Sequence, residues 1–261
     1  MNFSAIKDYK GDGRYYVHAV IVRNLDKLTF RPEDDIIDVG CGTGEETKAL
    51  ARKVNSATGI DTSDEMLAVA HANNSAPNIT YNWGDARTIG DNPDYLGRFD
   101  KAVSFFVLHW FPDHAKALRS ILACLKPGGE VLLIVSKPTT FAKEALAFLS
   151  SHAKWGEYMQ AYNSPYYFWN QSVAEMEQLF ESCGWTNPRS EIQYFLPETE
   201  LRTKIFLKTV WAASTQIPES DQEAYLEDLW QWALSRYPDE TRPGYVFFPI
   251  QLLVTHASKP L

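Results

Sequence analysis

The 261-residue sequence has only three cysteines, and they are too far apart to form a Cys-X-X-Cys pair or a Cys/His cluster. The spacing of Cys41, Cys124 and Cys183 argues against a disulfide framework and a structural zinc site, and favours buried free thiols. No apolar run approaches the roughly 18–20 residues that span a bilayer. The first residues also lack the basic and then apolar pattern of a secretory signal. We therefore expect a cytoplasmic protein with no metal and no membrane span.

Clusters of basic residues are lacking as well. The sequence has 25 Lys and Arg against 33 Asp and Glu, which gives a formal net charge of -8. Proteins that bind nucleic acid neutralise its phosphates with grouped Lys and Arg side chains, so no nucleic-acid partner is expected. With 45% hydrophobic residues the chain is of ordinary globular composition, and its length allows one large domain or two small ones.

Aromatic residues are abundant: the sequence has 14 Phe, 13 Tyr and 8 Trp. Of these 35 rings, 22 fall within residues 138–250, which make up less than half of the chain. Many of these rings are expected to form a local core. The excess nevertheless favours an apolar ligand pocket, because such pockets are lined mostly by hydrophobic and aromatic side chains.

Strand-like and helix-like segments alternate through the first half of the chain. The expected helices are 13–28, 45–54, 64–71, 115–125 and 172–184, and the expected strands are 35–39, 57–61, 79–82, 99–105, 130–135, 192–196 and 250–257. Alternation of this kind is typical of parallel strands joined by right-handed crossovers. The last two strands are separated by over fifty residues with helices near 199–213 and 220–236. That connection is too long for a hairpin and indicates either an inserted cap or additional core packing.

The predicted fold class is α/β, a Rossmann-like seven-stranded mostly parallel sheet with helices on both faces and a helical substrate cap from insertions. The predicted parts are an N-terminal helical lid (1–29), a cofactor-binding core (30–137), a cap insertion (138–171), core with the last helix and strand 6 (172–197), a helical cap insertion (198–249), and core with strand 7 (250–261).

A glycine-rich turn follows the first expected strand, in the run Asp38-Val39-Gly40-Cys41-Gly42-Thr43-Gly44. Such a turn at the carboxyl end of a parallel strand lets a ligand approach the backbone closely. Glu45 stands where a dinucleotide fingerprint requires its third glycine, and its charge would repel a pyrophosphate at the helix N-terminus. No Lys-Ser/Thr follows, which excludes a P-loop. The expected ligand is a nucleoside with a cationic or zwitterionic end.

Two acids follow the next two strands in order. Asp61 ends the second strand, where a carboxylate matches the two neighbouring hydroxyls of a ribose. Asp85 follows the third strand in Gly84-Asp85-Ala86, where it could accept a hydrogen bond from the amine of adenine. Each acid alone would read as a solvated loop residue, but their order after successive strands favours a nucleoside site.

Over about residues 30–137 the sequence resembles the class I S-adenosylmethionine-dependent methyltransferases. The resemblance rests on these motifs together with Phe99-Asp100 and Leu125-Lys126-Pro127-Gly128-Gly129. A looser resemblance is to the juvenile hormone acid and farnesoic acid O-methyltransferase group. It rests on the segment 104–110, on Lys154-Trp155, on 164–166 and on 254–257. That group usually carries a Gln in the first helix, whereas this sequence has Gly13-Arg14-Tyr15-Tyr16-Val17-His18 there. The pattern Trp110-Phe111-Pro112-Asp113 is shared with trans-aconitate-type methyltransferases.

The resemblance implies S-adenosyl-L-methionine as cofactor and S-adenosyl-L-homocysteine as product. It implies that Asp38, Gly40, Gly42 and Gly44 hold the methionine end and that Asp61 binds the ribose. The remaining implied cofactor residues are Thr62, Met66, Asp85, Ala86, Ser104 and Phe105, of which Met66 would pack under the adenine and the last two would lie beside the sulfonium.

His109 and Trp110 follow the fourth strand and are the predicted catalytic residues, as donors that position an acceptor carboxylate. A carboxylate is ionised at neutral pH and needs no general base, so alignment is the main task of the enzyme. The other predicted substrate residues are Arg14, Tyr15, Trp155, Tyr166 and Trp211.

The predicted reaction is in-line transfer of a methyl group to a small hydrophobic carboxylic acid, similar to farnesoic or juvenile hormone acid. One alternative is a phenol O- or amine N-methyltransferase with His109 as base. The others are an RNA or protein methyltransferase, which the charge disfavours, and a non-catalytic cofactor-binding protein. The expected assembly is a monomer or a homodimer.

Overall fold

The computed structural model describes residues 15–195, 204, 207–208, 211–247 and 250–261. The chain divides into two compact units. We call residues 21–136, 167–193 and 252–261 the sheet unit, and residues 1–20, 137–166 and 194–251 the helical unit.

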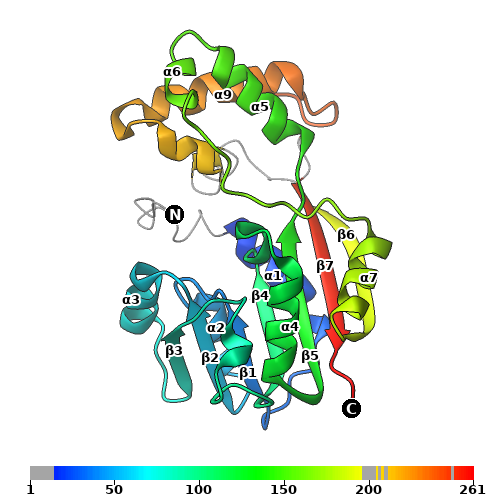
Figure 1. The fold of residues 1–261 in the computed structure, drawn as a ribbon. Helices are drawn as coiled ribbons and strands as arrows, with labels where there is room; N and C mark the ends of the chain where they lie inside the picture. Colours follow the sequence, from blue (N-terminus) through cyan, green and yellow to red (C-terminus); the bar gives the residue numbers. More distant parts are fainter. Residues whose placement is uncertain (1–14, 196–203, 205–206, 209–210, 248–249) are drawn as a thin grey trace. The chain divides into compact units, whose positions relative to one another are not determined.

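A seven-stranded sheet runs in the order β3-β2-β1-β4-β5-β7-β6 (Figure 1). The strands are β1 (Asp35–Val39), β2 (Ser56–Asp61), β3 (Ile79–Trp83), β4 (Phe99–Phe105), β5 (Leu125–Ser136), β6 (Thr186–Phe195) and β7 (Ile250–Ser258). The pairs β2–β3, β1–β2, β1–β4 and β4–β5 are parallel, whereas β5 and β7 are antiparallel. The predicted mostly parallel α/β sheet is confirmed.

The α-helices are α1 (Tyr15–Asn24), α2 (Glu45–Ala51), α3 (Asp64–Asn73), α4 (His114–Cys124), α5 (Thr140–Ser151), α6 (Gly156–Met159), α7 (Val173–Ser182) and α9 (Gln222–Arg236). Their starts follow local chemistry. Ser63 caps α3 by accepting a hydrogen bond from the Met66 N–H at 3.2 Å. Ser172 and Glu175 form a capping box at the start of α7.

Helices cover both faces of the sheet. On one face, α4 and α7 bury Leu118, Ile121 and Phe180 in a cluster with the sheet residues Leu133 and Leu253. The opposite face carries a smaller cluster made by Cys41, Leu67, Ala70 and Tyr81. Because side chains alternate along a strand, a strand covered on both faces supplies both layers, which explains the nearly continuous burial of β1, β4 and the second half of β5.

The helical unit has an aromatic core of its own. Phe148 and Trp232, from α5 and α9, are stacked with ring centroids 5.2 Å apart. Trp155 is fully buried and donates its indole N–H to the Asp228 carboxylate at 2.9 Å. The Tyr225 ring lies edge-on to Trp155 at 5.8 Å. These contacts account for part of the aromatic excess in residues 138–250 by packing within the unit.

Three expected elements differ in the structure. The sixth strand was expected at 192–196, but β6 begins at Thr186, because its alternating polar residues do not give the apolar pattern of a buried strand. β5 begins at Leu125, and its pairing with β4 shifts register, since Leu125 pairs with Phe99 and Glu130 pairs with Lys101. Of the helix expected near 199–213, most residues lie outside the described part of the chain, and Ala212–Gln216 form a 3-10 helix (η6).

Candidate functional site

The strand order reverses between β1 and β4, which both lie in the middle of the sheet (Figure 1). In open α/β sheets a ligand binds outside the carboxyl ends of the strands at such a reversal. The residues that end β1, β2 and β4 are Val39, Asp61 and Phe105, and the parallel pairing brings these ends to one edge. Most of the site residues predicted from the sequence follow these strands directly.

The glycine loop, residues 40–44, leaves β1 in a conformation that needs glycine. Gly40, Gly42 and Gly44 have φ of 80°, 54° and 83°, in the left-handed region. The N–H groups of Gly40 and Cys41 both donate to the Ile60 carbonyl, at 2.8 and 2.9 Å. A Cβ on Gly42 would meet no atom of the described residues within 4 Å, so none of them fills the space beside the loop there. This cradle fits a ligand that approaches the backbone closely.

Asp61, at the end of β2, is hydrogen-bonded to the glycine loop. One carboxylate oxygen accepts the Gly42 N–H at 2.9 Å, and the other accepts the Ser63 N–H at 2.9 Å. Burial raises the pKa of Asp61, while the backbone N–H groups act in the opposite direction. Each oxygen retains a further lone pair, so the side chain can hold the loop and still accept ligand hydroxyls.

Asp38 is buried at the end of β1, and its carboxylate accepts the Thr47 hydroxyl at 2.5 Å. Thr47 belongs to α2, so this bond joins the strand to the helix that follows the glycine loop. A buried carboxylate beside the loop favours a cationic group on the ligand. This chemistry agrees with the zwitterionic end that the sequence indicates.

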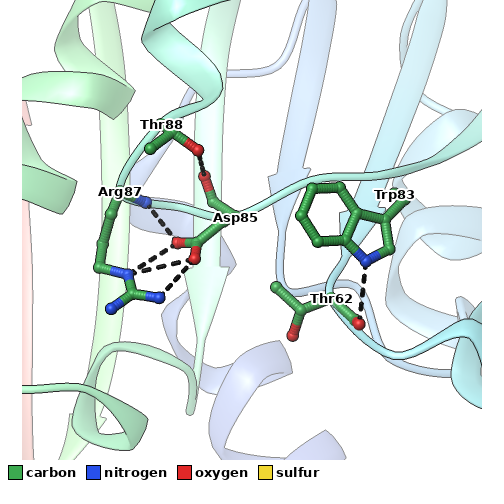
Figure 2. A network of polar contacts seen from close by, with 5 residues as sticks. All are labelled: Thr62, Trp83, Asp85, Arg87 and Thr88. Atoms are coloured by element: carbon green, nitrogen blue, oxygen red, sulfur yellow. Dashed lines mark hydrogen bonds and ion pairs between the residues drawn. The ribbon is translucent and has the colours of Figure 1, made fainter.

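Figure 2 shows the turn that follows β3. Both carboxylate oxygens of Asp85 accept from the Arg87 guanidinium, with one contact at 2.5 Å, and this pairing holds the pKa of Asp85 below its usual value. Asp85 is therefore charged and oriented by Arg87, which the sequence did not suggest. Beside this turn, Trp83 is 61% exposed and donates its indole N–H to the Thr62 carbonyl at 3.1 Å. Met66 and Ala86 are buried.

The turn after β4 interlocks with the glycine loop. The Ser104 hydroxyl donates to the Val39 carbonyl at 2.9 Å, across the two strands of the reversal. A Cβ on Gly40 would lie 2.2 Å from a Val107 methyl group, so the missing side chain makes room for Val107. Phe106, the residue before Val107, has φ of 60°, which is rare for a residue with a large side chain. Phe105, the last residue of β4, is buried.

Trp110 ends a short 3-10 helix, η5 (Leu108–Trp110), and donates its indole N–H to the Phe106 carbonyl at 3.2 Å. The sequence predicts that this N–H positions an acceptor carboxylate. In the structure it stabilises the turn that carries Phe106 and Val107, so a direct contact with the acceptor would require this hydrogen bond to be shared or broken.

His109 is buried, and its imidazole is stacked on Phe168 with centroids 6.0 Å apart. Its carbonyl accepts the Tyr167 N–H at 2.7 Å, which joins η5 to the segment that enters α7. Burial, with a smaller contribution from His114, lowers the pKa of His109 to about 3. The imidazole is therefore neutral at pH 7 and is a weak base.

Four predicted substrate residues belong to the helical unit. Trp155 lies in the core of that unit and Tyr15 begins α1. The Tyr166 hydroxyl accepts the Ala212 N–H at 3.0 Å, next to Trp211, which is partly exposed at the start of η6. The fifth, Arg14, lies outside the described residues. Their roles toward a substrate remain predictions.

Two residues that contact the glycine loop were missed by the sequence reasoning. Tyr81 in β3 and Asn74 at the end of α3 bond to the carbonyl oxygens of Gly44 and Thr43. One signal could have pointed to Tyr81. It pairs with Gly59 in the neighbouring strand, and a glycine opposite a large ring indicates that the ring fills the space above the glycine.

Comparison with known proteins identifies the class. Residues 37–133 match the family described as a methyltransferase domain. Over 181 residues, the chain is 33% identical to a demethylmenaquinone methyltransferase of Staphylococcus aureus, and the match covers 64% of this chain and 74% of that protein. The fold resembles the YcgJ protein of Bacillus subtilis, with a TM-score of 0.64 and 17% identity over 94% of this chain and 99% of that one.

Two further relatives have names that refer to acid substrates. A trans-aconitate 2-methyltransferase of Deinococcus radiodurans is 40% identical over 101 residues, which cover 38% of this chain. The match spans only 36% of that relative's length. A juvenile hormone acid O-methyltransferase of Bombyx mori is 27% identical over 75% of this chain and 72% of that protein.

The sheet order and the glycine loop define a Rossmann-like nucleoside-binding fold. With the matches above, the chain belongs to the class I S-adenosylmethionine-dependent methyltransferases. It is an enzyme, and its cofactor is S-adenosylmethionine. None of the described helices is long and apolar enough to cross a membrane. Within the same described part, no three His, Cys, Asp or Glu residues are grouped so that they could hold a metal ion.

Proposed function

We propose that this enzyme methylates the carboxylate of a small, hydrophobic carboxylic acid and forms its methyl ester. The observation that carries the proposal is the state of His109, the titratable side chain in the turn after β4, which is buried and has a pKa of about 3. A phenol or an ammonium acceptor must lose a proton, and a neutral imidazole of this pKa removes protons poorly. A carboxylate is already ionised at pH 7 and requires no base.

S-adenosylmethionine supplies a methyl group bonded to a positively charged sulfur, which is a good leaving group. What the chain contributes is binding and alignment, an effect that reaches roughly 7–11 kcal/mol in favourable systems. We propose that the glycine loop and Asp38 bind the methionine end and that Asp61 accepts the ribose hydroxyls. Thr62, Met66, Asp85 and Ala86 would surround the adenine, and Ser104 and Phe105 would lie beside the sulfur.

On the acceptor side, His109 is proposed to donate a hydrogen bond to the carboxylate, while Trp110 holds the adjoining turn. The names of two relatives, a trans-aconitate methyltransferase and a juvenile hormone acid methyltransferase, support an acid as the acceptor. The rings of the helical unit are proposed to select an apolar substrate, with Arg14, Tyr15, Trp155, Tyr166 and Trp211 as candidate contacts. We further propose a cytoplasmic enzyme that acts as a monomer or a homodimer.

The test is a methyl-transfer screen with the purified enzyme. Terpenoid, fatty, aromatic and tricarboxylic acids are offered beside matched phenols and amines, and products are detected by mass spectrometry. We expect products from acids, with higher kcat/KM for long apolar acids than for tricarboxylic acids. Products from phenols or amines alone would reject the carboxylate acceptor, and a preference for tricarboxylic acids would reject the apolar one.

A further inference from the structure

The carbonyl groups on the inner side of the glycine loop are held by two side chains from other elements. Asn74 donates its side-chain N–H to the Thr43 carbonyl at 2.7 Å. The Tyr81 hydroxyl lies 3.2 Å from the Gly44 carbonyl and 3.0 Å from the Asn74 carbonyl. All three of these hydrogen bonds are buried, so losing one would leave a polar group without a partner and away from water.

The Tyr81 ring also occupies the space that two missing side chains leave. A Cβ on Gly44 would lie 2.4 Å from the Tyr81 hydroxyl oxygen, and a Cβ on Gly59 would lie 2.7 Å from the ring. Gly44 has φ of 83° and precedes α2. Tyr81 therefore contacts both the end of the glycine loop and the strand that leads to Asp61.

Fixing these carbonyls also fixes the loop N–H groups. Across a planar trans peptide the C=O and the next N–H point in opposite directions. Holding the Thr43 and Gly44 carbonyls in place therefore also fixes the direction in which the N–H groups of Gly44 and Glu45 point. Glu45 is the first residue of α2, so the two side chains fix the backbone at the point where the glycine loop joins that helix.

We propose that Tyr81 and Asn74 are positioning residues for the cofactor, because they hold the glycine loop in the shape that binds S-adenosylmethionine. The inference rests on the proposed binding of the cofactor at residues 40–44 and does not depend on the identity of the acceptor. Burial raises the pKa of the Tyr81 hydroxyl, with smaller contributions from Cys41 and Asp38, so it remains a neutral donor.

The variant Tyr81→Phe keeps the ring and removes the hydroxyl. Tyr95→Phe is the matched control, because Tyr95 is also buried in the sheet unit and its hydroxyl accepts one hydrogen bond, from Asn82 at 2.9 Å. The full-length proteins are compared by calorimetric titration with S-adenosylmethionine alone, and by kcat and KM at saturating acceptor. Asn74→Leu removes the second donor, and thermal unfolding of each protein without cofactor measures the purely structural loss.

We expect Tyr81→Phe and Asn74→Leu to raise the Kd for S-adenosylmethionine about five- to tenfold, as the loss of one buried hydrogen bond would. The kcat at saturating cofactor should stay near wild type, and Tyr95→Phe should bind normally. Equal Kd values for Tyr81→Phe and Tyr95→Phe, raised or not, would overturn the inference. Asp61→Asn separates the two proposals: if it too leaves the Kd unchanged, the assignment of the cofactor site fails as well.

Discussion

The indole N–H of Trp110 is donated to the carbonyl of Phe106, four residues earlier, at 3.2 Å. Phe106 has φ of 60°, and the residue after it, Val107, fills the space beside Gly40. A left-handed conformation of a residue with a Cβ costs roughly 1–2 kcal/mol. The Trp110 bond offsets part of this cost. It therefore connects the predicted acceptor side of the site to the glycine loop.

Trp110→Phe should lower kcat by about five- to tenfold, because the ring remains but the Phe106 carbonyl loses its donor. The Kd for S-adenosylmethionine should change less than kcat. Trp185→Phe is the matched control, since Trp185 also donates its indole N–H to a backbone carbonyl, that of Leu118, at 3.2 Å. If steady-state kinetics show the same loss for both variants, Trp110 has no special role in the site.

Gly40→Ala should destabilise the protein by about 2–4 kcal/mol, because its Cβ would overlap Val107 and its φ is positive. Gly97 has φ of 60°, and no atom in the described part of the chain lies within 4 Å of a Cβ built on it, so Gly97→Ala measures the conformational cost. Urea unfolding of both, and of Gly40→Ala combined with Val107→Ala, separates the two effects. The double variant should recover part of the lost free energy of unfolding. If Gly40→Ala costs no more free energy of unfolding than Gly97→Ala, Val107 does not fill the space beside Gly40 as described.

The proposed cofactor side of the site follows from local sequence. The glycine run and the acids Asp61 and Asp85 each follow a strand, and parallel pairing brings strand ends together. The side chains that orient the glycine run and the two acids cannot be predicted from the local sequence. Arg87 pairs with Asp85 through a turn geometry that many sequences share, and Tyr81 reaches Gly44 only because of the register of β3 on β2. Nothing in the residue types at 104–110 indicates that Phe106 is left-handed.

The helical unit was less predictable for a related reason. The aromatic excess in residues 138–250 favours both a local core and an apolar pocket, and ring spacing does not separate rings that pack together from rings that line a pocket. Trp155 illustrates this, because the sequence predicts it as a substrate contact and the structure buries it with its N–H bonded to Asp228, so its role toward a substrate stays a prediction.

The pH profile of the reaction should be flat between about pH 6 and 9. Because the pKa of His109 is about 3, its imidazole is neutral through that range, and a carboxylic acid acceptor is ionised above about pH 5. His109→Asn should lower kcat and leave the profile flat. A rate that rises with pH and levels off near neutrality, with the rise lost in His109→Asn, would show that His109 acts as a base.

Glu130 should make stability depend on acid pH. Burial opposes its ionisation, but Lys101 and His256, the latter at 3.0 Å, hold the pKa of Glu130 below its usual value. This stabilisation is present above the unfolded pKa of about 4.3 and is lost as the pH falls through the lower folded value. Glu130→Gln should therefore cost roughly 1–3 kcal/mol at pH 7 and much less at the acid end, as measured by urea unfolding. A cost that does not change with pH would exclude this ion pair as its source.

The most direct test of the account uses S-adenosylmethionine with a deuterated methyl group and an apolar carboxylic acid that the screen selects. We expect the acid to gain one labelled methyl group and mild alkali to release it as labelled methanol, which a methyl ester does and a methyl ether or methylamine does not. A labelled product that survives alkali would contradict the transfer of the methyl group to a carboxylate.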